Sequence, residues 1–122
     1  MGIPSDAVHF VELIGSHDAV VISMAEHNGS YSAAFKNLYD WASRSEGKVW
    51  GGKAMLLLST SPGGRGGSTV IEAAKATFSR MGADLRANFS LPSFYDNFDL
   101  KIGVTDTELA AGLSAAIATL SA

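Results

Sequence analysis

The 122-residue chain has no cysteine and no excess of basic residues. The absence of cysteine excludes disulfides, thiolate metal sites and cysteine nucleophiles. Nine Lys and Arg against twelve Asp and Glu give a net charge of -3, so no basic surface is expected to attract nucleic acid or an anionic membrane. No apolar run approaches the length of a membrane span. The first six residues lack the basic and apolar parts of a signal peptide, and we therefore expect a cytoplasmic protein.

Motifs for metal-dependent and hydrolytic chemistry are missing as well. His9, His17 and His27 do not have the spacing of metal ligands, which argues against a zinc site. Ser30 does not lie in a Gly-x-Ser-x-Gly elbow, and no Ser/His/Asp triad can be assigned. The sequence therefore does not favour a hydrolase.

What the sequence does contain is an alternation of strand and helix patterns. Residues 19–24 and 54–58 are short apolar runs that predict buried parallel strands. Leu85, Ala87 and Phe89 alternate with polar residues, as in a half-exposed edge strand. Apolar residues at helical spacing predict four helices, over 5–15, 31–46, 69–82 and 105–120. This order predicts a single α/β domain with a parallel sheet and right-handed crossovers.

Residues that favour helix N-termini predict where these helices begin. The predicted caps are Ser5 for the first helix, Asn28 or Ser30 for the second, and capping boxes of Thr69 with Glu72 and of Thr105 with Glu108 for the third and fourth. The predicted apolar face of the second helix consists of Tyr31, Ala34, Phe35, Leu38 and Ala42. Tyr39 and Trp41 would then lie beside the core and not within it.

Two loops rich in Gly, Ser and Asn directly follow the two buried strands. In a parallel sheet, both loops lie at the carboxyl edge, where α/β folds bind cofactors. Residues 26–30 could present backbone N–H and C=O groups to a flat ring, or could be a simple turn from strand to helix. Residues 61–67 include four glycines, which let the backbone approach a flat ligand closely, or which merely make a flexible connection.

Three motifs in order resemble the NAD(P)H-dependent FMN reductase family, a flavodoxin-like group of flavin, quinone and azo reductases. They are residues 24–30 (MAEHNGS), 35–41 (FKNLYDW) and 61–67 (SPGGRGG). Ala25 stands where the family has Pro, and His27 where it has Tyr. The resemblance implies a flavodoxin-like three-layer sandwich, represented here by three strands, the family's third to fifth, and four helices. Its first strand, phosphate loop, first helix and second strand have no counterpart, so residues 1–122 are expected to form an incomplete flavin reductase domain.

The resemblance also implies a function. The expected protein is an oxidoreductase with FMN as cofactor, a flavoprotein that takes hydride from NADPH or NADH and passes electrons to a flavin, quinone, azo compound or similar acceptor. It implies no catalytic acid or base, because the cofactor carries the chemistry. The implied cofactor contacts are Ala25, Glu26, His27, Asn28, Gly29, Ser30, Ser61, Pro62, Gly63, Gly64 and Arg65. Two alternatives stay open: a noncatalytic fragment or interaction subunit of a split flavodoxin-like protein, and a flavodoxin-type electron carrier.

The predicted partners follow from the expected missing strands. Residues 19–24 would have an unpaired strand edge, and Val20, Val21 and Ile22 lack the charges or proline that protect such edges. We therefore expect a homo-oligomer or association with a chain that supplies the N-terminal strands. In the family, the helix that carries Tyr39 and Trp41 often contributes to a subunit interface. The aromatic residues of the loop over 91–103, Phe94, Tyr95 and Phe98, either cover a flavin or pack beneath the loop.

Overall fold

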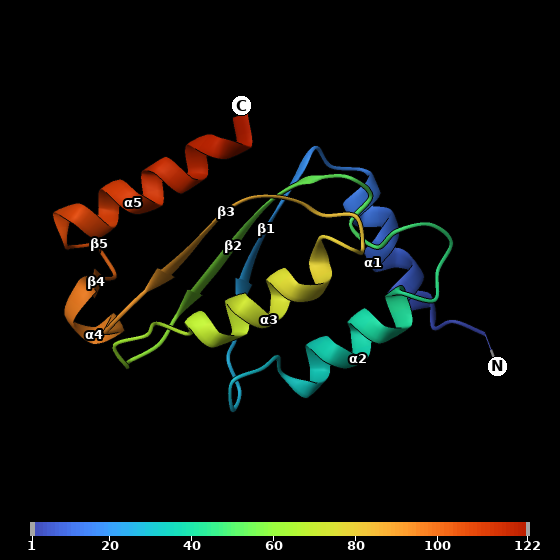
Figure 1. Cartoon of the computed structure of the whole chain (residues 1–122), viewed down its shortest axis with the longest axis horizontal. Coiled ribbons are helices and arrows are strands. Elements are labelled where there is room, and N and C mark those ends of the chain that lie inside the picture. The colour runs from blue at the N-terminus through green and yellow to red at the C-terminus, as the bar shows by residue number, and fades with distance from the viewer. Residues whose placement is uncertain (1, 122) are drawn as a thin grey trace.

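Three parallel strands form a sheet at the centre of the protein, which the computed structural model describes from residue 2 to residue 121. In chain order the elements are α1 (Ser5–Gly15), β1 (Ala19–Met24), α2 (Ala33–Ala42), β2 (Ala54–Thr60), α3 (Ser68–Phe78), β3 (Asp84–Leu91), α4 (Phe94–Asn97), β4 (Phe98–Asp99), β5 (Gly103–Val104), α5 (Thr107–Ala118) and the 3-10 helix η1 (Thr119–Ser121). Figure 1 shows α2 and α3 on one face of the sheet and α5 on the other. The predicted α/β fold with a parallel sheet is confirmed.

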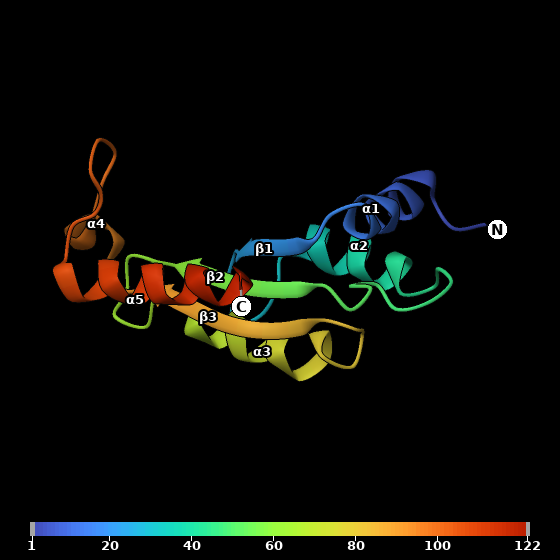
Figure 2. The ribbon, with the colours of Figure 1, turned by 90° about the horizontal axis from the view of Figure 1, so that it is seen from above.

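The strand order is β1-β2-β3, so β2 lies in the middle (Figure 2). Met55, Leu56 and Leu57 of β2 are at most 1% exposed, which explains why this strand is a continuous apolar run. Within residues 2–121, β1 pairs with β2 alone and therefore has one free edge. The side chain of Val21 on β1 is 52% exposed.

An aromatic cluster fills the space between the sheet and helices α2 and α3. Trp50, which lies in the connection between α2 and β2, is fully buried. Its ring centroid is 4.8 Å from that of Phe78 and 5.7 Å from that of Tyr39. Such close ring pairs add to the stabilisation that apolar burial already provides. Because Trp50 stands between glycines, at 47 and at 51–52, no helix or strand pattern marked it as a core residue.

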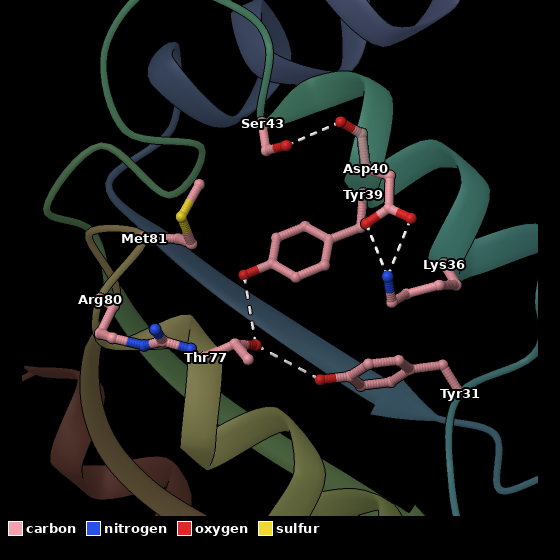
Figure 3. Close-up of a pocket in the computed structure, with 8 residues that line it drawn as sticks. All are labelled: Tyr31, Lys36, Tyr39, Asp40, Ser43, Thr77, Arg80 and Met81. Atoms are coloured by element: carbon pink, nitrogen blue, oxygen red, sulfur yellow. Dashed lines mark hydrogen bonds and ion pairs between the residues drawn. The ribbon is translucent and has the colours of Figure 1, made fainter.

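Hydroxyl groups also join α3 to α2 and to Tyr31, which lies just before α2. Tyr31 donates a hydrogen bond to the Ala73 carbonyl at 3.0 Å, and Tyr39 donates to Thr77 Oγ1 at 3.4 Å. Thr77 Oγ1 lies 3.4 Å from the Tyr31 hydroxyl as well. Tyr31, Tyr39 and Thr77 line a cavity of about 240 Å³ between α2 and α3 (Figure 3). The hydrogen bonds therefore satisfy the polar atoms of both tyrosines within an otherwise aromatic contact.

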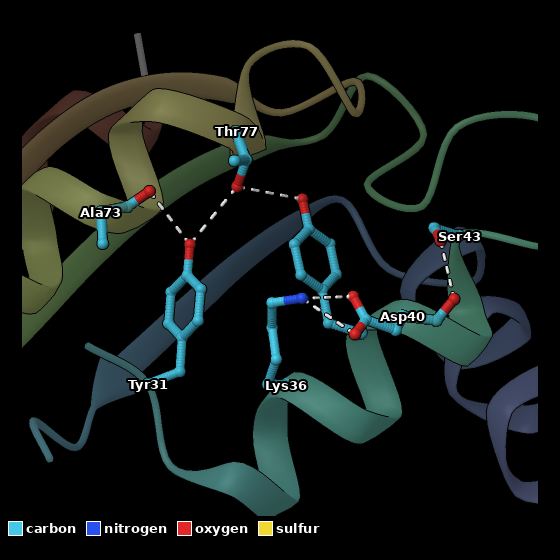
Figure 4. Close-up of polar contacts among 7 residues, drawn as sticks. Tyr31, Lys36, Asp40, Ser43, Ala73 and Thr77 are labelled. Carbon is cyan, nitrogen blue, oxygen red and sulfur yellow. Dashed lines mark hydrogen bonds and ion pairs between the residues drawn. The ribbon is translucent and has the colours of Figure 1, made fainter.

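On the rim of this cavity, Lys36 and Asp40 form an ion pair one helical turn apart (Figure 4). The Lys36 ammonium donates to both carboxylate oxygens of Asp40 at 2.8 Å, which raises the pKa of Lys36 above its usual value. Both side chains are more than half exposed. Such exposed pairs contribute little to folding stability.

The helices begin at different caps from those predicted. Ser32 caps α2 by accepting a hydrogen bond from the Phe35 N–H, because residues 27–30 form a turn of their own and neither Asn28 nor Ser30 reaches the helix. Asp106, not Thr105, caps α5. Ser5 is the first residue of α1 and makes no cap bond. The predicted capping box of Thr69 with Glu72 does not form, because the N-cap residue of α3 is Gly67.

The segment after β3, predicted as a loop, contains the single-turn helix α4 and the two-residue strands β4 and β5. These elements are too short to show a periodic pattern, so four helices were predicted where a fifth short one exists. The rings of Phe94 and Phe98 stack with centroids 5.0 Å apart, whereas Tyr95 is 80% exposed. Phe94 and Phe98 therefore pack beneath the segment, and Tyr95 lies outside it.

Tyr39 was predicted beside the core, and this was wrong. Its side chain is 6% exposed and belongs to the aromatic cluster, whereas Ala34 of the predicted face is exposed. The buried stripe of α2 runs through Phe35, Tyr39 and Ala42, at the spacing i, i+4 and i+7. Trp41 is half-buried, so it alone stays a candidate for an interface.

We predict that Tyr39→Ala lowers the free energy of unfolding by about 3 to 5 kcal/mol, as expected for truncation of a buried aromatic ring. Trp41→Ala, on the same helix, is the matched control and should cost markedly less. Urea unfolding followed by far-UV circular dichroism measures both. An equal or larger loss in the Trp41 variant would contradict this assignment of the core.

Candidate functional site

The carboxyl ends of β1 and β2 meet at one edge of the sheet. Met24, the last residue of β1, pairs in register with Ser59 of β2. The first loop (residues 25–30) and the glycine loop (residues 61–67) therefore start side by side. This is the position where parallel α/β sheets bind their ligands.

The first loop is a fixed two-residue turn. His27 and Ser30 exchange both backbone hydrogen bonds, at 2.9 and 3.1 Å. Between them, Asn28 and Gly29 have φ angles of 51° and 81°, the left-handed conformation that Asn-Gly hairpin turns require. Four residues of this loop are exposed: Ala25, His27, Asn28 and Ser30. The backbone of this loop is thus held in one shape while its outer side is open.

Glu26 does not project into solvent with its neighbours. Its side chain is half-buried, and Oε1 accepts a hydrogen bond from the backbone N–H of Val70, in the first turn of α3, at 2.7 Å. Gly29 lies against the same turn, because a Cβ at this position would be 3.5 Å from Thr69 Cγ2. The sequence pattern predicts Glu26 in the loop but does not reveal this bond. A carboxylate is favoured at a helix N-terminus, but residues 26 and 70 are too far apart in sequence for a local pattern to pair them.

The glycine loop consists of a buried half and an open half. Gly66 and Gly67 are buried with φ of 58° and 77°, and a Cβ on Gly66 would lie 2.6 Å from the Leu91 carbonyl oxygen. At Gly64, in contrast, a Cβ would meet nothing within 4 Å, and at Gly63 only Ser61 Oγ at 3.8 Å. Only the second pair of glycines is therefore required by the fold.

Backbone hydrogen bonds from the segment after β3 hold the open half of the glycine loop in position. Phe94 N–H donates to the Ser61 carbonyl at 3.0 Å, and Ser93 N–H donates to the Gly63 carbonyl at 2.9 Å. Pro62, Gly64 and Arg65 are exposed. Among residues 2–121, the N–H groups of Gly63, Gly64 and Arg65 donate to no backbone acceptor. These donors and the free space above them suit a flat ring with polar edges.

The N-termini of the three long helices that follow strands, α2, α3 and α5, are less suited to bind a phosphate group. Helix N-termini bind phosphate through their free N–H groups. Here a side chain of the protein already accepts a hydrogen bond from one N–H group at each of these N-termini, Ser32 at α2, Glu26 at α3 and Asp106 at α5. The described residues thus fit the ring of a flavin better than its phosphate.

Two other classes of site are absent from the described part of the chain. No group of three or more His, Cys, Asp or Glu side chains in it could hold a metal ion. None of its helices has the length and apolar character needed to cross a membrane.

Comparison with known proteins identifies the family. The family model of NADPH-dependent FMN reductases matches residues 1–96, and the chain belongs to this family. Membership implies FMN and NAD(P)H as the cofactors of the family, and it confirms the resemblance seen in the three motifs.

Individual relatives agree with this assignment. The chain is similar to the 2-hydroxy-1,4-benzoquinone reductase of Burkholderia sp., with 41% identity over 64 residues, 52% of this chain and 35% of that protein. It is also similar to an NAD(P)H-dependent FMN reductase of Pseudomonas aeruginosa, with 35% identity over 63 residues, 52% of this chain and 34% of that protein. These matches span about a third of the length of the two curated relatives.

A solved structure supports the fold. FerB of Paracoccus denitrificans, a flavoenzyme NAD(P)H:(acceptor) oxidoreductase, superposes with a TM-score of 0.75 and 27% sequence identity. The superposition covers 97% of this chain and 67% of FerB. The predicted flavodoxin-like class is thereby confirmed.

Proposed function

We propose that this chain provides the ring-binding part of an FMN-dependent oxidoreductase that uses NADPH or NADH. The observation that carries the proposal is the open half of the glycine loop, which lies at the same sheet edge as a fixed Asn-Gly turn. When bound, FMN would accept hydride from the nicotinamide and pass electrons to an acceptor. Membership of the FMN reductase family supports this chemistry.

In this proposal the protein binds and orients, and no side chain is assigned as an acid or base. The turn from His27 to Ser30 and the exposed backbone at Ala25 would face one part of the ring. The residues Ser61, Pro62, Gly63 and Gly64 would contact its edge or opposite side. Because orientation and distance dominate such transfers, preformed loops favour the reaction. Arg65, which is exposed beside these glycines, is a candidate for a phosphate of NADPH.

The electron acceptor is proposed to be a quinone, flavin, azo compound or similar small molecule. Two similar proteins support this class, since one is a benzoquinone reductase and the other an NAD(P)H:(acceptor) oxidoreductase. A flat acceptor would use the same open edge after the nicotinamide has left.

A second polypeptide segment is proposed to complete the sheet beside β1. The free edge of β1 and the half-exposed Val21 support this, because such an edge pairs readily with another strand. The partner would be a chain that supplies the N-terminal strands or a second copy of this chain. A noncatalytic interaction subunit is the alternative, and purified protein that binds no flavin would favour it.

We predict that Gly63→Val combined with Gly64→Val weakens flavin binding at least about tenfold, because two branched side chains would fill the space of the ring. The unfolding midpoint should hardly change, since a Cβ at either position meets open space or only a side-chain hydroxyl. The control is Gly2→Val with Gly15→Val, two equally open positions outside both loops. Titration by flavin fluorescence quenching measures the affinity. A folded double variant with unchanged affinity would refute this placement of the ring.

We also predict that the chain alone self-associates and that Val21→Lys reduces this association. A lysine at the free strand edge places a charge where another strand would pair, so both the association and the unfolding midpoint, which association raises, should decrease. Ile117→Lys on α5, where the native side chain is similarly exposed at 50%, is the control. Light scattering over a concentration series measures the assembly. A wild-type chain that stays soluble and monomeric throughout would overturn the proposed pairing at β1.

A further inference from the structure

The N-terminus of α3 has no cap of its own and takes one from the first loop. The residue at its N-cap position is Gly67, which has no side chain. The Glu26 carboxylate acts as the cap instead, because it accepts a hydrogen bond from the Val70 N–H at 2.7 Å. The interaction is favourable in two ways, since the carboxylate satisfies a free N–H group and its charge faces the positive end of the helix dipole.

We propose that Glu26 is a positioning residue that sets the spacing of the two loops around the flavin ring, an inference that rests on the proposed function. The first loop continues from β1 at Met24, and Glu26 and Gly29 hold it against the first turn of α3. That turn follows directly from Gly67, so it is continuous with the glycine loop. One side chain thus fixes the first loop to the element that extends from the second.

The glycine loop is itself fixed, which makes this connection effective. Gly66 packs directly against the Leu91 carbonyl, and Ser59 Oγ donates to the Gly66 carbonyl at 2.7 Å. A shift of the glycine loop would break these buried contacts, and a shift of the first loop would break the half-buried bond of Glu26. Loss of the Glu26 bond would free the first loop and leave the second in place.

The same carboxylate also directs how a flavin lies. Because Glu26 occupies the N-terminus of α3 with a negative charge, a phosphate is repelled from the helix end nearest to the glycine loop. In the proposed arrangement, the phosphate-bearing chain of FMN would therefore point away from α3. Glu26 therefore favours a single orientation of the cofactor.

The test compares Glu26→Met and Glu26→Gln with the control Glu72→Met. Glu72 lies on α3 but is exposed, and its ion pair is with Lys75 of the same helix. Two readouts are measured: the hydrogen exchange rate of the Val70 amide in the flavin-free protein, and the Kd for riboflavin by fluorescence quenching. Riboflavin carries the ring without the phosphate. Far-UV circular dichroism checks that the variants are folded.

In Glu26→Met we expect the Val70 exchange rate and the riboflavin Kd each to rise about tenfold, the change that corresponds to loss of one helix cap. Glu26→Gln keeps an acceptor oxygen without the charge, so both values should rise only about threefold, and Glu72→Met should change neither. If Glu26→Met does not fold, the threefold changes in Glu26→Gln decide the question.

Faster Val70 exchange with an unchanged riboflavin Kd would overturn the positioning role and leave Glu26 as a cap for stability alone. Unchanged exchange would overturn the cap itself. A wild-type chain that binds no riboflavin, yet shows protected Val70, would refute the proposed function and with it the role in positioning, while the capping bond would stand.

Discussion

The parallel pairing of β2 with β1 on one side and β3 on the other determines where the helices and the candidate loops of this protein lie. Parallel strands need long crossovers, and here these crossovers contain α2 and α3, which cover one face of the sheet, while α5 after β5 covers the other (Figure 1). The same pairing brings the carboxyl ends of β1 and β2 together, since Met24 and Ser59 are partners in register. The backbone pairing alone therefore places both loops of the candidate site at one edge of the sheet.

Side chains and glycines then make this edge rigid. Gly66 allows the glycine loop to pack against the carbonyl of Leu91, and Glu26 joins the first loop to α3. The outer backbone of both loops stays open, so the site combines a fixed shape with free hydrogen-bond donors. Side chains of the protein already cap α2, α3 and α5, and two of these caps, Glu26 and Asp106, are carboxylates that disfavour a phosphate nearby. A flavin held here would be bound by its ring, and its phosphate would need groups from another segment.

Much of this fold follows from local patterns in the sequence, and the exceptions have physical reasons. The buried strands and the four long helices are visible because their apolar periodicity extends over a full element. The single turn of α4 is too short to show a period, and Trp50 belongs to the core although glycines surround it. Tyr39 was misplaced because two apolar stripes on α2 compete, and only packing against Phe78 decides between them. The candidate loops were found as strand-loop-helix motifs, but the Glu26–Val70 bond depends on the tertiary fold.

If these loops bind the ring of a flavin and not its phosphate, the purified chain should bind FMN and riboflavin alike, and titration with both ligands measures this. A site without hydrogen bonds to the phosphate would bind FMN about two to four decades more weakly than a site that has them. We expect both ligands to bind with Kd values within about threefold of each other, at about 1 μM or weaker. Binding of FMN at least about a hundredfold more tightly than riboflavin, or no binding of either ligand, would show that the loops do not form a site for the ring alone.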